Sequence, residues 1–115
     1  MEDLEKFLRY AKINTQADDT TGTTPSTECQ KDLGRLLVEE LLELGLKDAH
    51  MDKFGNVYAH LQGSSRRVGL NAHMDTALEV TDKNVNPQIV KNYDGSDIKL
   101  KNDITLSIKQ FPYMK

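Results

Sequence analysis

The sequence of 115 residues lacks tryptophan and contains a single cysteine, Cys29. One thiol cannot form a disulfide within the chain, so the fold cannot depend on internal disulfides. No apolar run approaches the roughly 20 residues that a membrane-spanning helix needs. Basic residues are not in excess, since 15 lysines and arginines face 18 aspartates and glutamates, and the formal net charge is −3. Nucleic-acid binding therefore has no electrostatic support.

The first residues of the chain, MEDLEK, are acidic and lack the basic and apolar regions of a secretory signal. Together with the lone cysteine, this composition predicts a soluble cytoplasmic protein that binds neither membranes nor nucleic acid. A chain of this length is enough for one small domain and not for two.

Two stretches have the apolar spacing of amphipathic helices. The first runs from residue 2 to residue 11 or 12, with apolar residues at i, i+3, i+4 and i+7 starting from Leu4. The second opens where Thr27 and Gln30 have the spacing of a capping box. Its leucine stripe ends before Gly45, a residue suited to the left-handed position past the end of a helix.

Shorter alternations of apolar and polar residues predict strands. They occupy residues 47–52, 57–61 and 67–72, with further strands starting at residue 98 and over residues 104–108. Turn-forming residues separate these segments, and the stretch from residue 77 to residue 92 is irregular. Two helices followed by strands of this kind predict an α/β fold class.

The segment at residues 67–76, RVGLNAHMDT, is the one that we expect to carry chemistry. Its apolar residues alternate with small ones up to Ala72, as in a buried strand. His73 and Asp75 follow directly, and residues at i and i+2 of an extended backbone project to the same side. In open α/β sheets, functional sites lie beyond the carboxyl ends of the strands. His73 is therefore predicted to face a metal ion, with Asp75 as its supporting carboxylate or as another group of the same site.

The same tripeptide, His-Met-Asp, also occurs at residues 50–52 and provides a comparison within the chain. There it precedes a turn and ends an outer strand, so His73 is the favoured ligand and His50 is not. The simpler interpretation of both is a strand-end histidine bonded to its neighbours. His60 lies opposite the apolar residues of its strand and is interpreted as a surface histidine. Cys29 has no evident base and is not predicted to be a nucleophile.

Three segments resemble those of the tripeptide aminopeptidases of the M20 metallopeptidase family, in the same order and at similar separations. They are residues 25–28 (PSTE), 73–76 (HMDT) and 83–90 (KNVNPQIV). The third is the most specific, because it separates this branch from other members of the family. The resemblance runs from the first helix to near Lys115, and it identifies the chain with the N-terminal part of the family's catalytic domain.

The resemblance implies a partial three-layer sheet of the zinc-exopeptidase kind, with two N-terminal helices and mixed strands. It implies that His73 ligates one zinc ion of a two-zinc centre and that Asp75 is the catalytic aspartate. Asn71 departs from the small or apolar residue that is usual at its position, which would alter the packing under the site. The implied activity is the release of the N-terminal residue from tripeptide substrates.

Members of this family continue well past this length. The resemblance also implies a bridging aspartate, a glutamate pair that includes the general base, a further carboxylate, a late histidine and a small lid domain, none of which the sequence contains. We therefore expect the chain, as a cut or truncated product, to be inactive alone and to self-associate through an open sheet edge. Two alternatives remain: a non-catalytic fold or interaction module, and another M20-type dipeptidase or deacylase.

Overall fold

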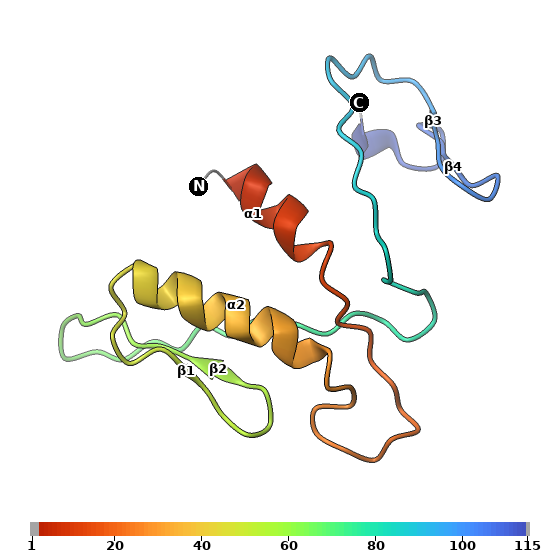
Figure 1. Cartoon of the computed structure of the whole chain (residues 1–115). Coiled ribbons are helices and arrows are strands. Elements are labelled where there is room, and N and C mark those ends of the chain that lie inside the picture. Colours follow the sequence, from red (N-terminus) through yellow and green to blue (C-terminus); the bar gives the residue numbers. More distant parts are fainter. Residues whose placement is uncertain (1–2, 115) are drawn as a thin grey trace.

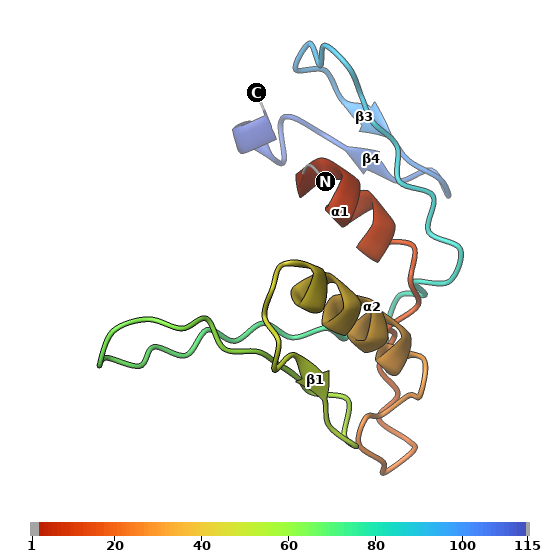
Figure 2. The same cartoon turned by 60° about the vertical axis from the view of Figure 1, so that its left-hand side comes forward.

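The computed structural model describes residues 3–114. In chain order its elements are α1 (Asp3–Tyr10), α2 (Gln30–Glu43), β1 (His50–Met51), β2 (Val57–Tyr58), β3 (Ile98–Lys99), β4 (Thr105–Leu106) and a short 3-10 helix, η1 (Pro112–Met114). Figure 1 shows these elements joined by long irregular connections. Figures 1 and 2 both place the β3–β4 hairpin on the side of α1 away from α2. The fold class is α/β, as the sequence predicted.

The end of α2 is a Schellman motif. Gly45 adopts a φ of 90°, and its N–H donates to the carbonyl of Leu42 at 2.9 Å. The next N–H, that of Leu46, donates to the carbonyl of Leu41 at 3.0 Å. These two bonds satisfy carbonyls that would otherwise have no partner at the end of a helix. The predicted role of Gly45 is therefore confirmed.

The predicted start of α2 is wrong. The helix begins at Gln30, later than expected, and its N-cap residue, Cys29, makes no side-chain capping bond. The Thr27 hydroxyl donates instead to the carbonyl of Gln16 at 2.8 Å, and the Gln30 side chain donates to the Ser26 hydroxyl at 3.0 Å. The Thr27 hydroxyl, which local spacing had assigned to the helix cap, thus bonds to the preceding loop instead.

The strands pair only within two short hairpins among the described residues. β1 and β2 pair antiparallel, and Gly55, with a φ of 86°, lies in the turn between them. The Asp52 carboxylate accepts the N–H groups of Phe54 and Asn56 in this turn, each at 2.9 Å. β3 and β4 form a second, separate antiparallel sheet. These strands are confirmed in position but are shorter than the predicted ranges.

Residues 67–72, predicted as the central strand, are not a strand. Val68 and Leu70 are 84% and 97% exposed, and no backbone hydrogen bond ties this stretch to another part of residues 3–114. A strand requires a neighbour to pair with its N–H and C=O groups. No segment of the described chain pairs with this stretch. An isolated parallel bridge between Gln16 and Thr76 follows this stretch.

The buried core is small and lies between α2 and the β1–β2 hairpin. Leu33 and Ala49 are buried apolar residues of this core. Leu61, Val68 and Leu70, on the apolar side of their predicted strands, do not join this core, because all three are highly exposed. The Cα radius of gyration is 17.8 Å, whereas a compact domain of this length has one of about 13 Å. The described chain therefore leaves much apolar surface open.

α1 contacts α2 through polar groups. Arg9 forms an ion pair with Glu40, and the Tyr10 hydroxyl donates to the same carboxylate. The apolar Phe7 remains 64% exposed. The predicted first helix is confirmed at Asp3–Tyr10, while its predicted start at residue 2 lies outside the described residues. Neither this helix nor any other in residues 3–114 has the length and apolar character needed to cross a membrane.

Candidate functional site

His73 and Asp75 contact each other directly. His73 Nδ1 lies 2.9 Å from the backbone carbonyl oxygen of Asp75 and 3.2 Å from its Oδ1. A carbonyl and a carboxylate oxygen can only accept, so these contacts place the ring proton on Nδ1. The lone pair of Nε2 is then free, and the His73 side chain is 84% exposed. In this arrangement a histidine can offer Nε2 to a metal ion while a carboxylate or carbonyl orients its other nitrogen.

Both residues of the pair line a broad hollow of about 950 Å³. Residues 70–75 form one side of this hollow, and α2 and β2 contribute other sides through residues that include Glu40 and Tyr58. His73 therefore stands at an opening and is not packed into the protein.

The backbone that follows Asp75 is anchored to the N-terminal loop. The Thr76 N–H donates to the Thr15 carbonyl at 3.2 Å, and the Thr76 carbonyl accepts the Ala17 N–H at 3.0 Å. Oδ2 of Asp82 accepts the Thr15 N–H at 2.6 Å and the Thr76 hydroxyl at 2.7 Å. We call Thr15, Thr76 and Asp82 together the threonine clamp. It holds the chain immediately next to the histidine–aspartate pair.

The threonine clamp is not visible in the sequence. Asp82 and Thr15 are 67 residues apart, and no local pattern relates residues at such a separation. Burial disfavours the charged form of Asp82, but hydrogen bonds from Thr15 and Thr76 outweigh it and hold the pKa of Asp82 below its ordinary value of 3.8. The carboxylate is therefore ionised at neutral pH, and its bonds to the two threonines are charge-assisted.

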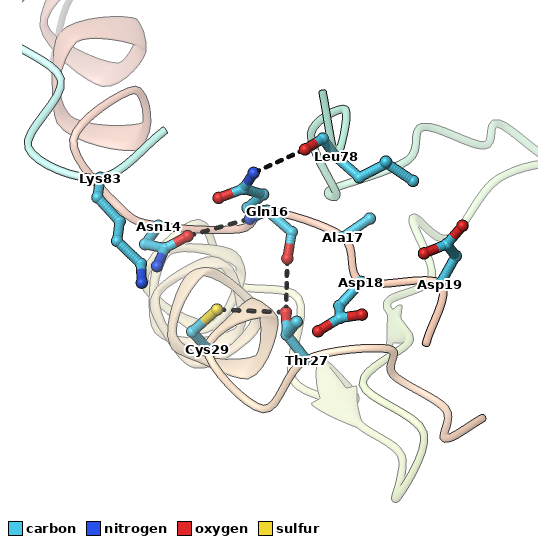
Figure 3. Close-up of a pocket in the computed structure, with 9 residues that line it drawn as sticks. All are labelled: Asn14, Gln16, Ala17, Asp18, Asp19, Thr27, Cys29, Leu78 and Lys83. Atoms are coloured by element: carbon cyan, nitrogen blue, oxygen red, sulfur yellow. Dashed lines mark hydrogen bonds between the residues drawn. The ribbon is translucent and has the colours of Figure 1, made fainter. Parts of the chain in front are cut away.

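A second cavity, of about 370 Å³, lies between the N-terminal loop and the start of α2. Figure 3 shows Gln16 at its centre, where the side-chain amide donates to the Leu78 carbonyl at 3.0 Å and the backbone carbonyl accepts the Thr27 hydroxyl. Cys29 also lines this cavity, with its Sγ 3.2 Å from the Thr27 hydroxyl oxygen. The side-chain partner of Cys29 is thus a hydroxyl and not a base that would activate the thiol.

The two other histidines make Nδ1 contacts of the same kind as His73, to a backbone carbonyl at His50 and to a carboxylate at His60. His50 Nδ1 lies 2.8 Å from the Asp48 carbonyl, and the His50 ring stacks on Tyr58 with 5.4 Å between centroids. His60 pairs with the Asp48 carboxylate, and the hydrogen bond from its backbone N–H is the main cause that lowers the pKa of Asp48. Neither histidine lines the hollow beside His73. All three histidines therefore have the local bonding expected of a surface histidine bonded to its neighbours, and the position at the hollow is what distinguishes His73.

Within residues 3–114, no group of three or more histidine, cysteine, aspartate or glutamate side chains is placed to hold a metal ion. A catalytic zinc ion takes about three protein ligands and keeps a position open for water or substrate. His73, with a free Nε2, fits one position in such a ligand set. The described residues do not complete the set.

The described residues define an α/β segment with an exposed histidine–carboxylate pair, a description that many proteins share. Proteins named Peptidase T are similar to nearly the whole chain. Identity is 48% over 107 residues to the one from Clostridium perfringens strain 13, 49% over 115 residues to that of Shouchella clausii, and 45% over 117 residues to that of Bacillus subtilis.

These alignments cover 90%, 96% and 96% of this chain, respectively. They cover 26%, 28% and 28% of the relatives, so the chain spans about a quarter of their length. No family model matches the chain. The chain is thus homologous to peptidase T along nearly all of its own length, which confirms the resemblance found in its three sequence segments.

Proposed function

We propose that the chain is the N-terminal part of the catalytic domain of a zinc-dependent aminopeptidase of the M20 metallopeptidase family, which releases the N-terminal residue from tripeptides. The observation that carries this proposal is the 45–49% identity with peptidase T over 90–96% of the chain. The segments at 25–28, 73–76 and 83–90 support the tripeptide branch by resemblance. In this proposal the complete fold is a three-layer zinc-exopeptidase sheet with an added lid domain.

His73 is proposed to ligate zinc through Nε2, and Asp75 is proposed to be the catalytic aspartate beside it. The contact between His73 Nδ1 and Asp75 supports both roles, because it favours the tautomer in which Nε2 is unprotonated. Zinc, when bound, would polarise a substrate carbonyl and activate a water molecule. Because the described residues supply a single ligand, they support metal binding and orientation but no catalytic step of their own.

The test of this proposal is a zinc titration of the 115-residue chain, followed by NMR of its three histidine rings. We expect zinc to move the His73 resonances at lower concentration than those of His50 and His60, because His73 alone borders the hollow with a free Nε2. Asp75→Asn keeps the shape of the side chain but removes its charge, and it should weaken the response of His73 alone. A titration in which His73 is the least responsive histidine would rule out its role as a ligand.

The exposed apolar stretch supports a second candidate, an interaction module. Val68 and Leu70 lie on unpaired backbone and are almost fully exposed, and unpaired backbone of this kind can accept a strand from another chain. A dipeptidase or deacylase of the same family is less well supported, because the relatives described above are all named Peptidase T. A tripeptide as substrate and the cytoplasm as location stay predictions.

A further inference from the structure

The peptide group between Asp75 and Thr76 makes hydrogen bonds from both of its sides. Its carbonyl oxygen lies 2.9 Å from His73 Nδ1, and its N–H donates to the Thr15 carbonyl at 3.2 Å. A trans peptide group is planar, so its N–H and C=O point in opposite directions as one rigid unit. The bond to Thr15 therefore fixes the direction of the carbonyl that accepts the His73 proton.

Asp82 binds both Thr15 and Thr76, the two residues joined by this backbone hydrogen bond. Its Oδ2 accepts the Thr15 N–H at 2.6 Å, the Thr76 hydroxyl at 2.7 Å and the Thr15 hydroxyl at 3.4 Å. Thr15 is only 3% exposed, whereas the His73 ring is open to solvent. The buried end of the arrangement is therefore Thr15, and its exposed end is the His73 ring. Loss of the Asp82 carboxylate would release both threonines together.

The threonine clamp is also tied to the segment that precedes α2. Gln16, which follows Thr15, accepts the Thr27 hydroxyl on its backbone carbonyl at 2.8 Å. Its side-chain amide donates to the Leu78 carbonyl on the other side (Figure 3). These bonds thus position the backbone next to Asp75 relative to the segment that precedes α2. None of them involves His73.

We propose that Asp82 is a positioning residue for His73. Acting through Thr15 and Thr76, it orients the peptide after Asp75 so that the His73 proton stays on Nδ1 and Nε2 faces outward. This inference rests on the proposed function for its catalytic meaning, because a metal ion requires an unprotonated ring nitrogen. The tautomer itself can be measured without a metal, so the inference and the proposed function can fail separately.

Long-range proton–nitrogen NMR of the histidine rings tests the proposal in the 115-residue chain. At alkaline pH we expect His73 to be mainly in the Nδ1–H form. Asp82→Ala should lower the ratio of the Nδ1–H to the Nε2–H form at His73 by about two- to tenfold, the range expected for the loss of one net hydrogen bond. The resonances of His50 and His60 should not move, since neither histidine contacts the threonine clamp.

Two variants provide the controls. Asp82→Asn keeps an acceptor oxygen and should restore the His73 tautomer ratio. Asp94→Ala removes an exposed carboxylate that accepts from Ser96 and lies outside the threonine clamp, so it should leave the ratio unchanged. An Asp94→Ala effect as large as that of Asp82→Ala would mean that charge alone is responsible, and it would overturn the proposal.

Thr76→Val covers the case in which Asp82→Ala unfolds the chain, as shown by a loss of helical circular dichroism. It removes a single hydroxyl and keeps the backbone bond to Thr15, so it should shift the tautomer ratio in the same direction by a smaller factor. An unchanged ratio in a folded Asp82→Ala chain, or in Thr76→Val, would overturn the inference. A changed ratio without any response of His73 to zinc would instead overturn the proposed function and leave the positioning role of Asp82 standing.

Discussion

Gly34 of α2 lies directly against Met51 of β1, so that a β-carbon at position 34 would stand 2.5 Å from the Met51 sulfur. The same β-carbon would lie 3.5 Å from Cγ2 of Val57 on β2. A glycine inside a helix costs about 1 kcal/mol relative to alanine. The close approach of α2 to both strands of the hairpin offsets that cost, and it is the main contact between helix and sheet in the described chain.

Gly34→Leu should lower the free energy of unfolding by about 1–3 kcal/mol, the usual effect of overpacking a close contact. Gly34→Ala should be close to neutral, because the end of the Met51 side chain can move aside and alanine favours the helix. Thermal unfolding followed by far-UV circular dichroism measures both. If Gly34→Leu were as stable as the unaltered chain, α2 would not pack on the hairpin in this way.

Gly45→Ala should destabilise the end of α2. Gly45 has a φ of 90°, and an L-residue in the left-handed region costs roughly 1–2 kcal/mol. Gly63→Ala is the matched control, since no heavy atom lies within 4 Å of a β-carbon there and its φ is not in the left-handed range. Equal thermal stability of the two variants would contradict the Schellman motif described above.

The features predicted correctly from the sequence depend on residues that are close in the chain. The apolar spacing of α1 and α2 and the glycine after α2 are of this kind, because helical bonds join residues three or four apart. The capping box failed although its spacing was right, since the Thr27 hydroxyl found a distant acceptor at Gln16. Local spacing shows which bonds a side chain can make, but not which partners tertiary folding brings to it.

The same distinction explains the errors around the candidate site. The alternation at residues 67–72 showed which residues share a face, but a strand also requires a neighbour that no local pattern reveals. His73 and Asp75 were identified because they are two residues apart in the chain. Asp82 was missed because its contacts with Thr15 and Thr76 arise only when the chain folds back on itself.

The contribution of Asp82 to stability should depend on pH. Its pKa is lowered in the folded chain from the ordinary value of 3.8, so the folded state favours the ionised form. The resulting stabilisation is fully present above that ordinary value and is lost as the pH falls through the lower, folded pKa. Asp82→Asn should therefore be less stable than the unaltered chain at neutral pH, and the difference should shrink in acid.

Urea unfolding at a series of pH values from neutral to strongly acidic measures this difference. The exposed carboxylates of Asp48 and Asp52 also have lowered pKa values, but they are the same in both chains and cancel in the comparison. A stability difference that stays constant down to the lowest pH would show that Asp82 acts through its shape and not through its charge.

The chain should self-associate through its exposed apolar stretch. Leu61, Val68 and Leu70 are more than four-fifths exposed, and unpaired backbone beside them can pair with a second copy. Light scattering over a range of concentrations should show a rising mean mass, which Val68→Lys and Leu70→Lys should reduce. Val80→Lys is the matched control, because Val80 is also exposed but lies outside this stretch. A single monomeric mass at every concentration would exclude this mode of association.

The 115-residue chain alone should not hydrolyse tripeptides, even with zinc or cobalt added. A catalytic zinc site takes about three protein ligands, and His73 is the only one that residues 3–114 place with a free ring nitrogen at the hollow. One imidazole holds the ion weakly, and two-metal hydrolysis requires a second ion a few ångströms away. Release of free alanine from trialanine measures the activity, with His73→Ala as the matched variant. Turnover that persists in His73→Ala would come from a contaminating peptidase, whereas sustained turnover that disappears with it would mean that these residues already assemble a working site.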